Sequence, residues 1–356
     1  MKIVTVVGAR PQFIKAAMVS HELRKTHHEV LVHTGQHYDC QMSQVFFDEL
    51  DIPEPNYNLG IGSDSHARQT ARAMMALEEV LLKENPDMLL VYGDTNSTLA
   101  AALTASKMGI RIAHVEAGPR MFDMTVPEEV NRVVTDHLST LLFAPTQTSA
   151  ENLAKEGITG GVHLTGDVMY DAFLKYAPIA SGKSRILERL GLHQKGYAYV
   201  TVHRARNTDD PIRLRAIVRA LIDLDTRLVL PVHPRTRKSL EAAGLCRELA
   251  SASHVTLSEP VGYLDSLMLT MEARTIVTDS GGLQREAYFA QVPCLTLDDA
   301  TPWPETIACG WNTLVPCMSN TLTEVVQVPR CCDGYPPLFG NGGAAQSIAR
   351  LIGSLA

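Results

Sequence analysis

The sequence lacks any apolar run that approaches about 18 residues, the length a helix needs to span a membrane. Its first residues, MKIVTVVGA, are typical of a strand and not of the apolar segment of a signal peptide. These two absences lead us to expect a cytoplasmic protein with no membrane partner.

A surplus of positive charge is also missing. The chain has 32 Lys and Arg residues against 39 Asp and Glu residues, which gives a formal net charge of −7. This balance argues against a nucleic-acid partner and against attraction to an anionic membrane surface. An anionic ligand would therefore have to be held by a few local Arg and Lys side chains.

The common motifs for disulfides, metal ions and dinucleotides are absent too. The seven cysteines are scattered and never form C-x-x-C, and the 13 histidines form neither H-E-x-x-H nor H-x-H. The glycine fingerprint G-x-G-x-x-G does not occur. We therefore expect reduced thiols, no metal ion and no nicotinamide or flavin cofactor.

What the sequence does contain is an alternation of apolar strands and helices over 356 residues, a length that suits about two domains. In the first half the predicted strands cover residues 2–7, 29–34, 88–92, 110–115, 141–144 and 162–165. In the second half they cover residues 199–202, 227–230, 255–257, 275–277, 294–297 and 312–315. Residues 178–184 are expected to be the linker between the halves. The alternation predicts an α/β fold with two doubly wound parallel sheets facing a cleft.

Acidic residues follow two of the predicted strands. Asp94 comes after the strand at 88–92, and Glu116 comes after the strand at 110–115. In open α/β sheets, ligands bind beyond the carboxyl ends of the strands, so both carboxylates are candidate functional residues. A purely structural role for Glu116 is equally open on this pattern alone.

A structural interpretation competes more strongly for the helix that follows. Thr125 and Glu128 fit a capping box around Pro127. Glu128, Arg132 and Asp136 recur every fourth residue, as in a solvated stripe of ion pairs. The opposite face of this helix is expected to be apolar and to carry Val130, Val133, Val134 and Leu138. Spacing alone favours the structural interpretation of Glu128.

Two basic residues stand at the first turn of the chain. Arg10 and Lys15 place two cations at the start of a predicted helix, where the backbone N–H groups also favour an anion. Ordinary surface charges would explain them equally well.

Eight motifs follow one another along the chain: GARPQFIK from Gly8, GQHYD from Gly35, GDTNST from Gly93, HVEAGxR from His114, PEExNR from Pro127, HRxxN from His203, PVHP from Pro231 and TDSGGxQxE from Thr278. In this order and over nearly the whole chain, they resemble the non-hydrolysing UDP-N-acetylglucosamine 2-epimerase family. Among its branches, GARPQFIK, GQHYD, GDVMYD from Gly166 and TPWPET from Thr301 are more similar to the branch that acts on UDP-2,3-diacetamido-2,3-dideoxyglucuronate.

The resemblance implies a fold of the glycosyltransferase B type. Residues 1–177 would form a Rossmann-like domain on the sugar side, and residues 178–339 would form a second Rossmann-like domain that binds UDP. Residues 340–356 would form a helix that returns to the first domain. The resemblance also implies a homodimer that needs neither a cofactor nor a metal ion.

The implied reaction inverts C2 of a UDP-N-acetylhexosamine, of the UDP-GlcNAc to UDP-ManNAc type, by elimination of UDP to a glycal and re-addition. Four residues would be catalytic: Asp94, Glu116, Glu128 and His203. The carboxylates would transfer protons and stabilise a cationic C1, while His203 would assist departure of the β-phosphate. Eight residues would bind the substrate or support its site: Arg10, Lys15, Arg132, His233, Ser280, Gly281, Gly282 and Glu286.

Four positions depart from the family pattern. Arg206 stands where the family has Glu, and Asp298 stands where an Arg is common. We therefore hypothesise that Arg206 and Asp298 form an ion pair in swapped order. Ser266 replaces a common Phe near the uracil, and Pro119 replaces a Leu. These departures keep two alternatives open, a glycosyltransferase of the same fold that needs an acceptor and a catalytically altered protein that only binds UDP-sugars.

Overall fold

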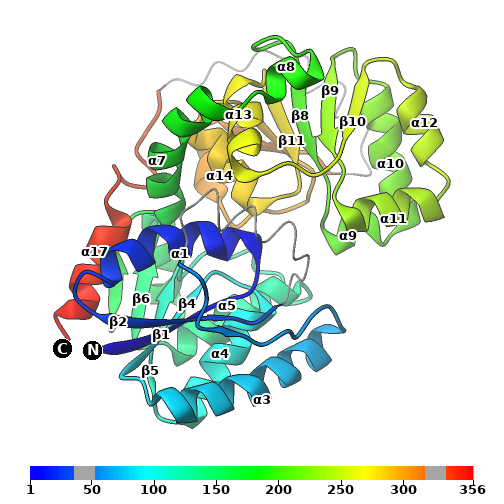
Figure 1. Ribbon diagram of the computed structural model, residues 1–356. Helices are drawn as coiled ribbons and strands as arrows, with labels where there is room; N and C mark the ends of the chain where they lie inside the picture. The colour runs from blue at the N-terminus through cyan, green and yellow to red at the C-terminus, as the bar shows by residue number, and fades with distance from the viewer. Residues whose placement is uncertain (36–52, 317–333, 356) are drawn as a thin grey trace. The chain divides into compact units, whose positions relative to one another are not determined.

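The computed structural model describes residues 1–35, 53–316 and 334–355, which fall into two compact units (Figure 1). The first unit contains Met1–Leu174 and Pro337–Ala356, and the second unit contains Lys175–Pro336. The predicted GQHYD motif lies outside the described residues from its second position on.

The described sheet of the first unit has seven parallel strands in the order β3-β2-β1-β4-β5-β6-β7. Their bounds are β1 (Lys2–Val7), β2 (His28–His33), β3 (Tyr57–Asn58), β4 (Met88–Tyr92), β5 (Arg111–Val115), β6 (Leu141–Ala144) and β7 (Val162–Leu164). The central strand β4 is buried over its whole length. This burial is expected because a parallel sheet is covered by helices on both faces.

The helices of the first unit are α1 (Arg10–Leu23), α3 (His66–Glu84), α4 (Asn96–Lys107), α5 (Pro127–Leu138), α6 (Gln147–Lys155), the first part of α7 (Val168–Lys183), and α17 (Ala344–Gly353). Figure 1 shows α1 and α17 on one face of the sheet and α3 and α4 on the other. Apolar side chains of α3 and α4 share one core with valines of β1 and β2.

The second unit has a six-stranded described sheet in the order β10-β9-β8-β11-β12-β13. Its strands are β8 (Ala198–Thr201), β9 (Leu228–Pro231), β10 (Val255–Ser258), β11 (Thr275–Thr278), β12 (Cys294–Thr296) and β13 (Asn312–Leu314). Its helices are the rest of α7, α8 (Ile186–Leu190), α9 (Ala205–Thr208), α10 (Pro211–Ile222), α11 (Pro234–Ala242), α12 (Cys246–Ser251), α13 (Tyr263–Glu272), α14 (Gly281–Phe289) and α15 (Pro304–Ala308).

The predicted α/β fold with two parallel sheets is confirmed. Each of the twelve predicted strands is present, with its ends within one residue of the prediction. None of the described helices is long and apolar enough to cross a membrane.

Residues 178–183 of the predicted linker are helical, and the division between the two units, after Leu174, falls within the same helix. Helix α7 runs through Pro178 and ends only at Lys183. A proline inside a helix removes one backbone hydrogen bond. Burial of one face of α7, which includes Met169, Ala172 and Tyr176, offsets this loss. The helix therefore continues where the sequence indicates a break.

The predicted orientation of α5 is wrong. Its buried residues are polar or charged, namely Glu129, Asn131, Arg132, Thr135 and Asp136, whereas the predicted apolar face is only partly buried. Val126 is the N-cap, and the Thr125 hydroxyl donates to Asp123 instead of capping the helix. The solvated stripe and the capping box are therefore both absent from α5.

Candidate functional site

Two acidic residues leave the first unit's sheet at the same edge, as predicted. Strands β4 and β5 are neighbours, with Tyr92 beside Val115, and Asp94 and Glu116 follow the two strands. The backbone φ of Glu116 is +73°, a left-handed conformation that is unfavourable for a residue with a Cβ atom. Such outliers cluster at functional sites, and this one lies at the edge where ligands bind in open α/β sheets.

Lys15 of α1 is the partner of Glu116. The Lys15 Nζ lies 2.5 Å from Oε2 of Glu116, and both side chains are buried. Gly93 makes room for this contact, because a Cβ atom at that position would lie 3.1 Å from the Lys15 Nζ. Gly93 also has a left-handed φ of +59°, which a glycine adopts without strain.

Arg132 of α5 contacts Asp94 and a second carboxylate, that of Glu129. Its guanidinium pairs with Asp94 on one side and lies 2.9 Å from Glu129 on the other. Burial alone would lower the pKa of Arg132, but the carboxylates of Asp94, Glu129 and Glu116 raise it. Lys15, Asp94, Glu116 and Arg132, all predicted from the sequence, thus form one connected group.

Glu129 is a buried member of this group that the sequence reasoning missed. Its Oε1 accepts hydrogen bonds from the backbone N–H groups of Met121, at 2.9 Å, and Phe122, at 2.7 Å. Its Oε2 accepts from Arg132. Phe122 also has a left-handed backbone, with φ of +59°. Glu129 therefore ties the loop before α5 to the cation that holds Asp94.

His114 and Asp136 support the turn that carries Asp94. The Nδ1 of His114 lies 2.7 Å from Asp136, and its Nε2 lies 2.8 Å from the carbonyl oxygen of Gly93. Asp136 also pairs with Arg120 at 2.7 Å. Burial alone would raise the pKa of Asp136, but His114 and Arg120 lower it. This buried network fixes the backbone at Gly93.

Glu128 and Arg10 complete the set of residues predicted in the first unit. Glu128 is exposed at the second position of α5, one residue before the buried Glu129. Arg10 is the first residue of α1, and its side chain lies outside the described part of the chain.

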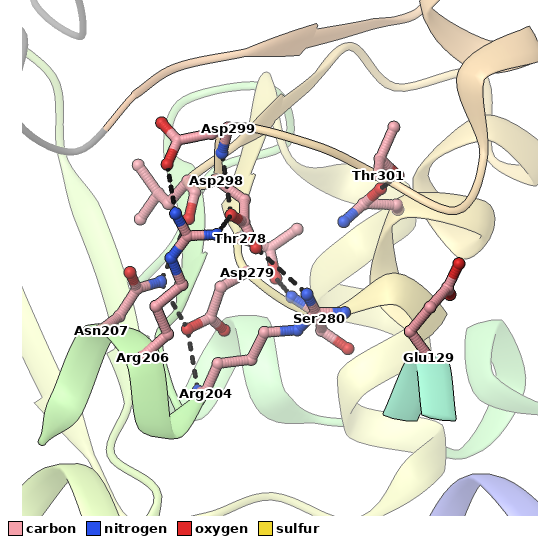
Figure 2. A network of polar contacts seen from close by, with 12 residues as sticks. Glu129, Arg204, Arg206, Asn207, Thr278, Asp279, Ser280, Asp298, Asp299 and Thr301 are labelled. Carbon is pink, nitrogen blue, oxygen red and sulfur yellow. Dashed lines mark hydrogen bonds and ion pairs between the residues drawn. The ribbon is translucent and has the colours of Figure 1, made fainter. Parts of the chain in front are cut away.

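In the second unit, His203 is held by a buried carboxylate. His203 follows β8 and Asp279 follows the neighbouring strand β11. Asp279 accepts from the backbone N–H group of His203. It also accepts from the backbone N–H group of Arg204 and from the Asn207 side chain (Figure 2). The Nδ1 of His203 lies 3.1 Å from Asp279. Burial alone would raise the pKa of Asp279, but His203, Arg204 and Asn207 lower it to about 2.

The predicted phosphate-binding residues begin α14. Ser280 is its N-cap, and the Ser280 hydroxyl accepts from the backbone N–H of Leu283. Gly281 and Gly282 are the first helical residues, so their N–H groups lie at the positive end of the helix dipole. Glu286, on the same helix, is buried beside Tyr263, whose pKa is raised first by burial and then by this carboxylate.

His233 is the N-cap of α11, where its Nδ1 accepts from the backbone N–H of Arg235 at 3.2 Å. Its ring centroid lies 5.7 Å from that of His203. The structure therefore brings the two predicted histidines together, and it also gives His233 a structural task. Ser266 of α13 contacts the Tyr199 hydroxyl at 3.1 Å.

The hypothesised ion pair between Arg206 and Asp298 is confirmed, with an N–O distance of 3.2 Å. Asp298 also pairs with Arg204 at 3.1 Å, and Arg206 also pairs with Asp299 at 2.6 Å (Figure 2). The two charge inversions thus occur at positions that contact each other.

A sequence signal existed for Asp279, because it follows a strand as Asp94 does. No comparable signal marked Glu129, since an adjacent glutamate has the same chemistry. Within the part of the chain that the structure describes, no group of three or more His, Cys, Asp and Glu side chains could hold a metal ion.

Comparison with known proteins covers both units. A family model described as UDP-N-acetylglucosamine 2-epimerase matches residues 21–353. A UDP-N-acetylglucosamine 2-epimerase homolog of Methanococcus maripaludis is 50% identical, and the UDP-2,3-diacetamido-2,3-dideoxy-D-glucuronate 2-epimerase of Pseudomonas aeruginosa is 44% identical, each over 100% of both chains. Among solved structures, the chain is similar to the Methanocaldococcus jannaschii UDP-GlcNAc 2-epimerase crystallised in complex with UDP-GlcNAc and UDP, with 41% sequence identity. The match has a TM-score of 0.95 and covers 99% of this chain and 100% of that chain.

These matches confirm that the two sheets belong to a fold of the glycosyltransferase B type. The matched residues include every candidate site residue of both units except Arg10 and Lys15, which precede the family model but fall within the full-length relatives. The chain therefore belongs to the UDP-N-acetylglucosamine 2-epimerase family.

Proposed function

We propose that this chain is an isomerase that inverts C2 of a UDP-N-acetylhexosamine without net hydrolysis. Membership of the family supports this proposal, as do the names of relatives that act on UDP-GlcNAc and on UDP-2,3-diacetamido-2,3-dideoxy-D-glucuronate. The observation that carries it is the pair of carboxylates, Asp94 and Glu116, that leave one sheet edge and each have a buried cation as partner.

The chemistry explains why such a site needs both carboxylates and cations. The C2 proton of the sugar is not adjacent to a carbonyl group, so a base cannot remove it directly. When the C1–O bond breaks and its electron pair leaves on UDP, C1 becomes cationic and the C2 proton becomes acidic. Removal of that proton gives a glycal with a C1–C2 double bond. Re-addition of UDP at C1 and protonation of C2 from the opposite face give the epimer.

The first unit would supply the groups that act on the sugar. Asp94, Glu116 and Glu128 would transfer the C2 proton and stabilise the positive charge at C1. Lys15 and Arg132 hold two of these carboxylates in place. The left-handed backbone of Glu116 adds to the support, because strain of this kind persists only where the surrounding contacts hold the residue in place.

The second unit would bind UDP and assist its departure. Asp279 holds the ring of His203 through Nδ1, so that Nε2 is the atom that would donate to the β-phosphate oxygen. The N–H groups at the start of α14 would bind the diphosphate, with Ser280 as their cap. Glu286 would bind the ribose hydroxyls, and Arg10 and His233 would support the site.

Exchange of the C2 proton with solvent tests the proposal. The protein is incubated in D2O with UDP-GlcNAc, or with UDP-2,3-diacetamido-2,3-dideoxyglucuronate, and C2 is followed by NMR without an acceptor. We expect deuterium at C2 and formation of the epimer with one of the two sugars. A reaction that requires an acceptor would indicate a glycosyltransferase, and binding without exchange would indicate a protein that only recognises UDP-sugars.

Replacement of Glu116 tests the assignment of the site. Glu116→Gln keeps the size of the side chain but cannot accept a proton, so we expect turnover to fall at least a hundredfold. Near-normal deuterium exchange in this variant would remove Glu116 from the mechanism.

We also propose that the protein forms a homodimer through α3. This helix exposes Met75 and Leu82, 70% and 68% accessible, which are seven residues apart and therefore lie on the same face after two turns. Two large apolar side chains on one exposed helix face favour a protein partner.

A further inference from the structure

Asp298 lies just beyond β12, between two arginines of the second unit. Its carboxylate oxygens are 3.1 Å from Nη1 of Arg204 and 3.2 Å from Nη1 of Arg206. The Asp298 side chain is only 3% exposed, whereas the two arginine side chains are 24% and 41% exposed. A carboxylate that is this buried is costly unless cations pair with it, so Asp298 fixes the geometry of the group.

The second terminal nitrogen of Arg204 borders the first turn of α14. A Cβ atom added to Gly281 would lie 3.7 Å from Arg204 Nη2, which is van der Waals contact. The guanidinium thus stands at the positive end of the helix dipole, where two positive charges repel each other. An anion bound at this helix start would be attracted by both.

We propose that Asp298 is a positioning residue that aims Arg204 at the diphosphate of the substrate. The inference rests on the proposed function, because it requires a UDP-sugar whose phosphates bind at the start of α14. Asp298 does not contact the substrate in this scheme and acts through Arg204. The bond from Asp298 directs Nη1 of Arg204 to one side and leaves Nη2 facing the helix start.

Arg206 supports this arrangement from the other side. It pairs with Asp298 and, at 2.6 Å, with Asp299, which lies 3.8 Å from Arg213. Figure 2 shows the Arg206 guanidinium between the carboxylates of Asp298 and Asp299. Arg206 thus places a second positive charge beside the buried Asp298 carboxylate.

Substitution at two adjacent aspartates tests the proposal. Asp298→Asn keeps the size and removes the charge, and Asp299→Asn is the matched control, because Asp299 pairs with Arg206 and Arg213 and is half exposed. The dissociation constant of UDP is measured by calorimetry, and kcat and KM are measured for C2 exchange. We expect Asp298→Asn to weaken UDP binding about tenfold, the size of one charge-assisted contact, and Asp299→Asn to change it less than twofold.

Combination with Arg204→Met separates positioning from general support of the fold. If Asp298 acts through Arg204, adding Asp298→Asn to Arg204→Met changes the UDP dissociation constant less than twofold further. Two effects that multiply would overturn the proposal. If Asp298→Asn does not fold, Arg206→Gln replaces it in the same double-mutant cycle. Arg206→Gln removes one of the two cations that hold Asp298 and keeps the pair between Asp298 and Arg204. We then expect that adding Arg206→Gln to Arg204→Met changes the UDP dissociation constant less than twofold further.

The wild-type protein distinguishes failure of this inference from failure of the proposed function. A wild-type protein that neither binds UDP nor exchanges the C2 proton contradicts the proposed function. A wild-type protein that does both, together with an Asp298→Asn variant that behaves like Asp299→Asn, contradicts only the role given to Asp298.

Discussion

At the residue scale, the candidate site depends on buried carboxylates that each accept several hydrogen bonds. Asp279 shows this most clearly, because it accepts from two backbone N–H groups and the Asn207 side chain and also contacts His203. Its pKa is about 2, against an ordinary value of 3.8. A carboxyl whose pKa is lowered by folding stabilises the protein above the unfolded pKa, and this contribution is lost as the pH falls through the folded pKa.

We predict that Asp279→Asn lowers the free energy of unfolding at pH 7 by about 2 kcal/mol, which corresponds to the difference between the two pKa values. The gap between the variant and the parent should close as the pH falls from about 4 to about 2. Urea unfolding of both proteins across this range provides the measurement.

His203→Gln is the control for this experiment, since it removes one of the groups that lower the pKa and should give a smaller loss. A gap that stays constant down to pH 2 would show that the charge of Asp279 does not contribute.

At the same scale, the sequence predicts Asp94 and Glu116 because a carboxylate after a buried strand has few structural tasks. It does not predict how they are held. The pairing of Lys15 with Glu116 joins residues about a hundred positions apart, and only the order of β1, β4 and β5 in the sheet brings them together. Long-range ion pairs of this kind have no signature in local spacing.

At the scale of elements, α5 reverses the usual arrangement of an amphipathic helix. Its charged face is buried because that face supplies partners for Asp94, for the loop at Met121 and for Arg120. Helical spacing identifies two faces but not which one is buried. The choice depends on the polar groups that neighbouring turns present, and these become known only from the fold.

Two adjacent glutamates of α5 should therefore respond in opposite ways. We predict that Glu129→Met destabilises the protein by about 3 kcal/mol, because it leaves Arg132 with one partner fewer and removes the acceptor of two N–H groups. Glu128→Gln should change stability by less than about 0.5 kcal/mol, because Glu128 is exposed. The same Glu128→Gln should lower turnover at least a hundredfold if Glu128 transfers a proton.

Urea unfolding and C2 exchange, measured on both variants, decide this prediction. Normal turnover in Glu128→Gln would assign the catalytic role to the other carboxylates. Normal stability in Glu129→Met would show that the contacts of Glu129 are dispensable.

Helix α7 illustrates a second limit of local patterns. Pro178 and Gly182 indicate a break, yet the helix continues through both. The burial of its apolar face outweighs the local preference of two residues, and burial is a property of the packed unit.

At the scale of the whole molecule, the fold was predictable because a parallel sheet leaves a strong record in the sequence. Continuous apolar runs such as residues 88–92 give each strand, and the helices between them require parallel order. Two features escaped prediction: strand β3 has only two residues, and helix α7 continues through Pro178, where a proline indicates a break.

The proposed homodimer gives a prediction at this scale. Replacing Met75 and Leu82 together by Glu should place charges on the exposed face of α3 and convert the dimer into monomers. Light scattering coupled to gel filtration measures the molar mass. Ile212→Glu, on an equally exposed apolar residue of α10, is the control and should leave the dimer intact. A double variant that keeps the mass of two chains would exclude α3 as the interface.

The last helix has a consequence for how the protein is made. Helix α17 packs on α1, and Asp171 accepts from the backbone N–H of Ala345 near its start, so both ends of the chain complete the first unit. On a ribosome, the second unit is fully synthesised while the first still lacks its final piece. Until α17 has been synthesised and packs on α1, newly made chains lack a helix whose buried face is apolar, and its contact surface on α1 remains uncovered.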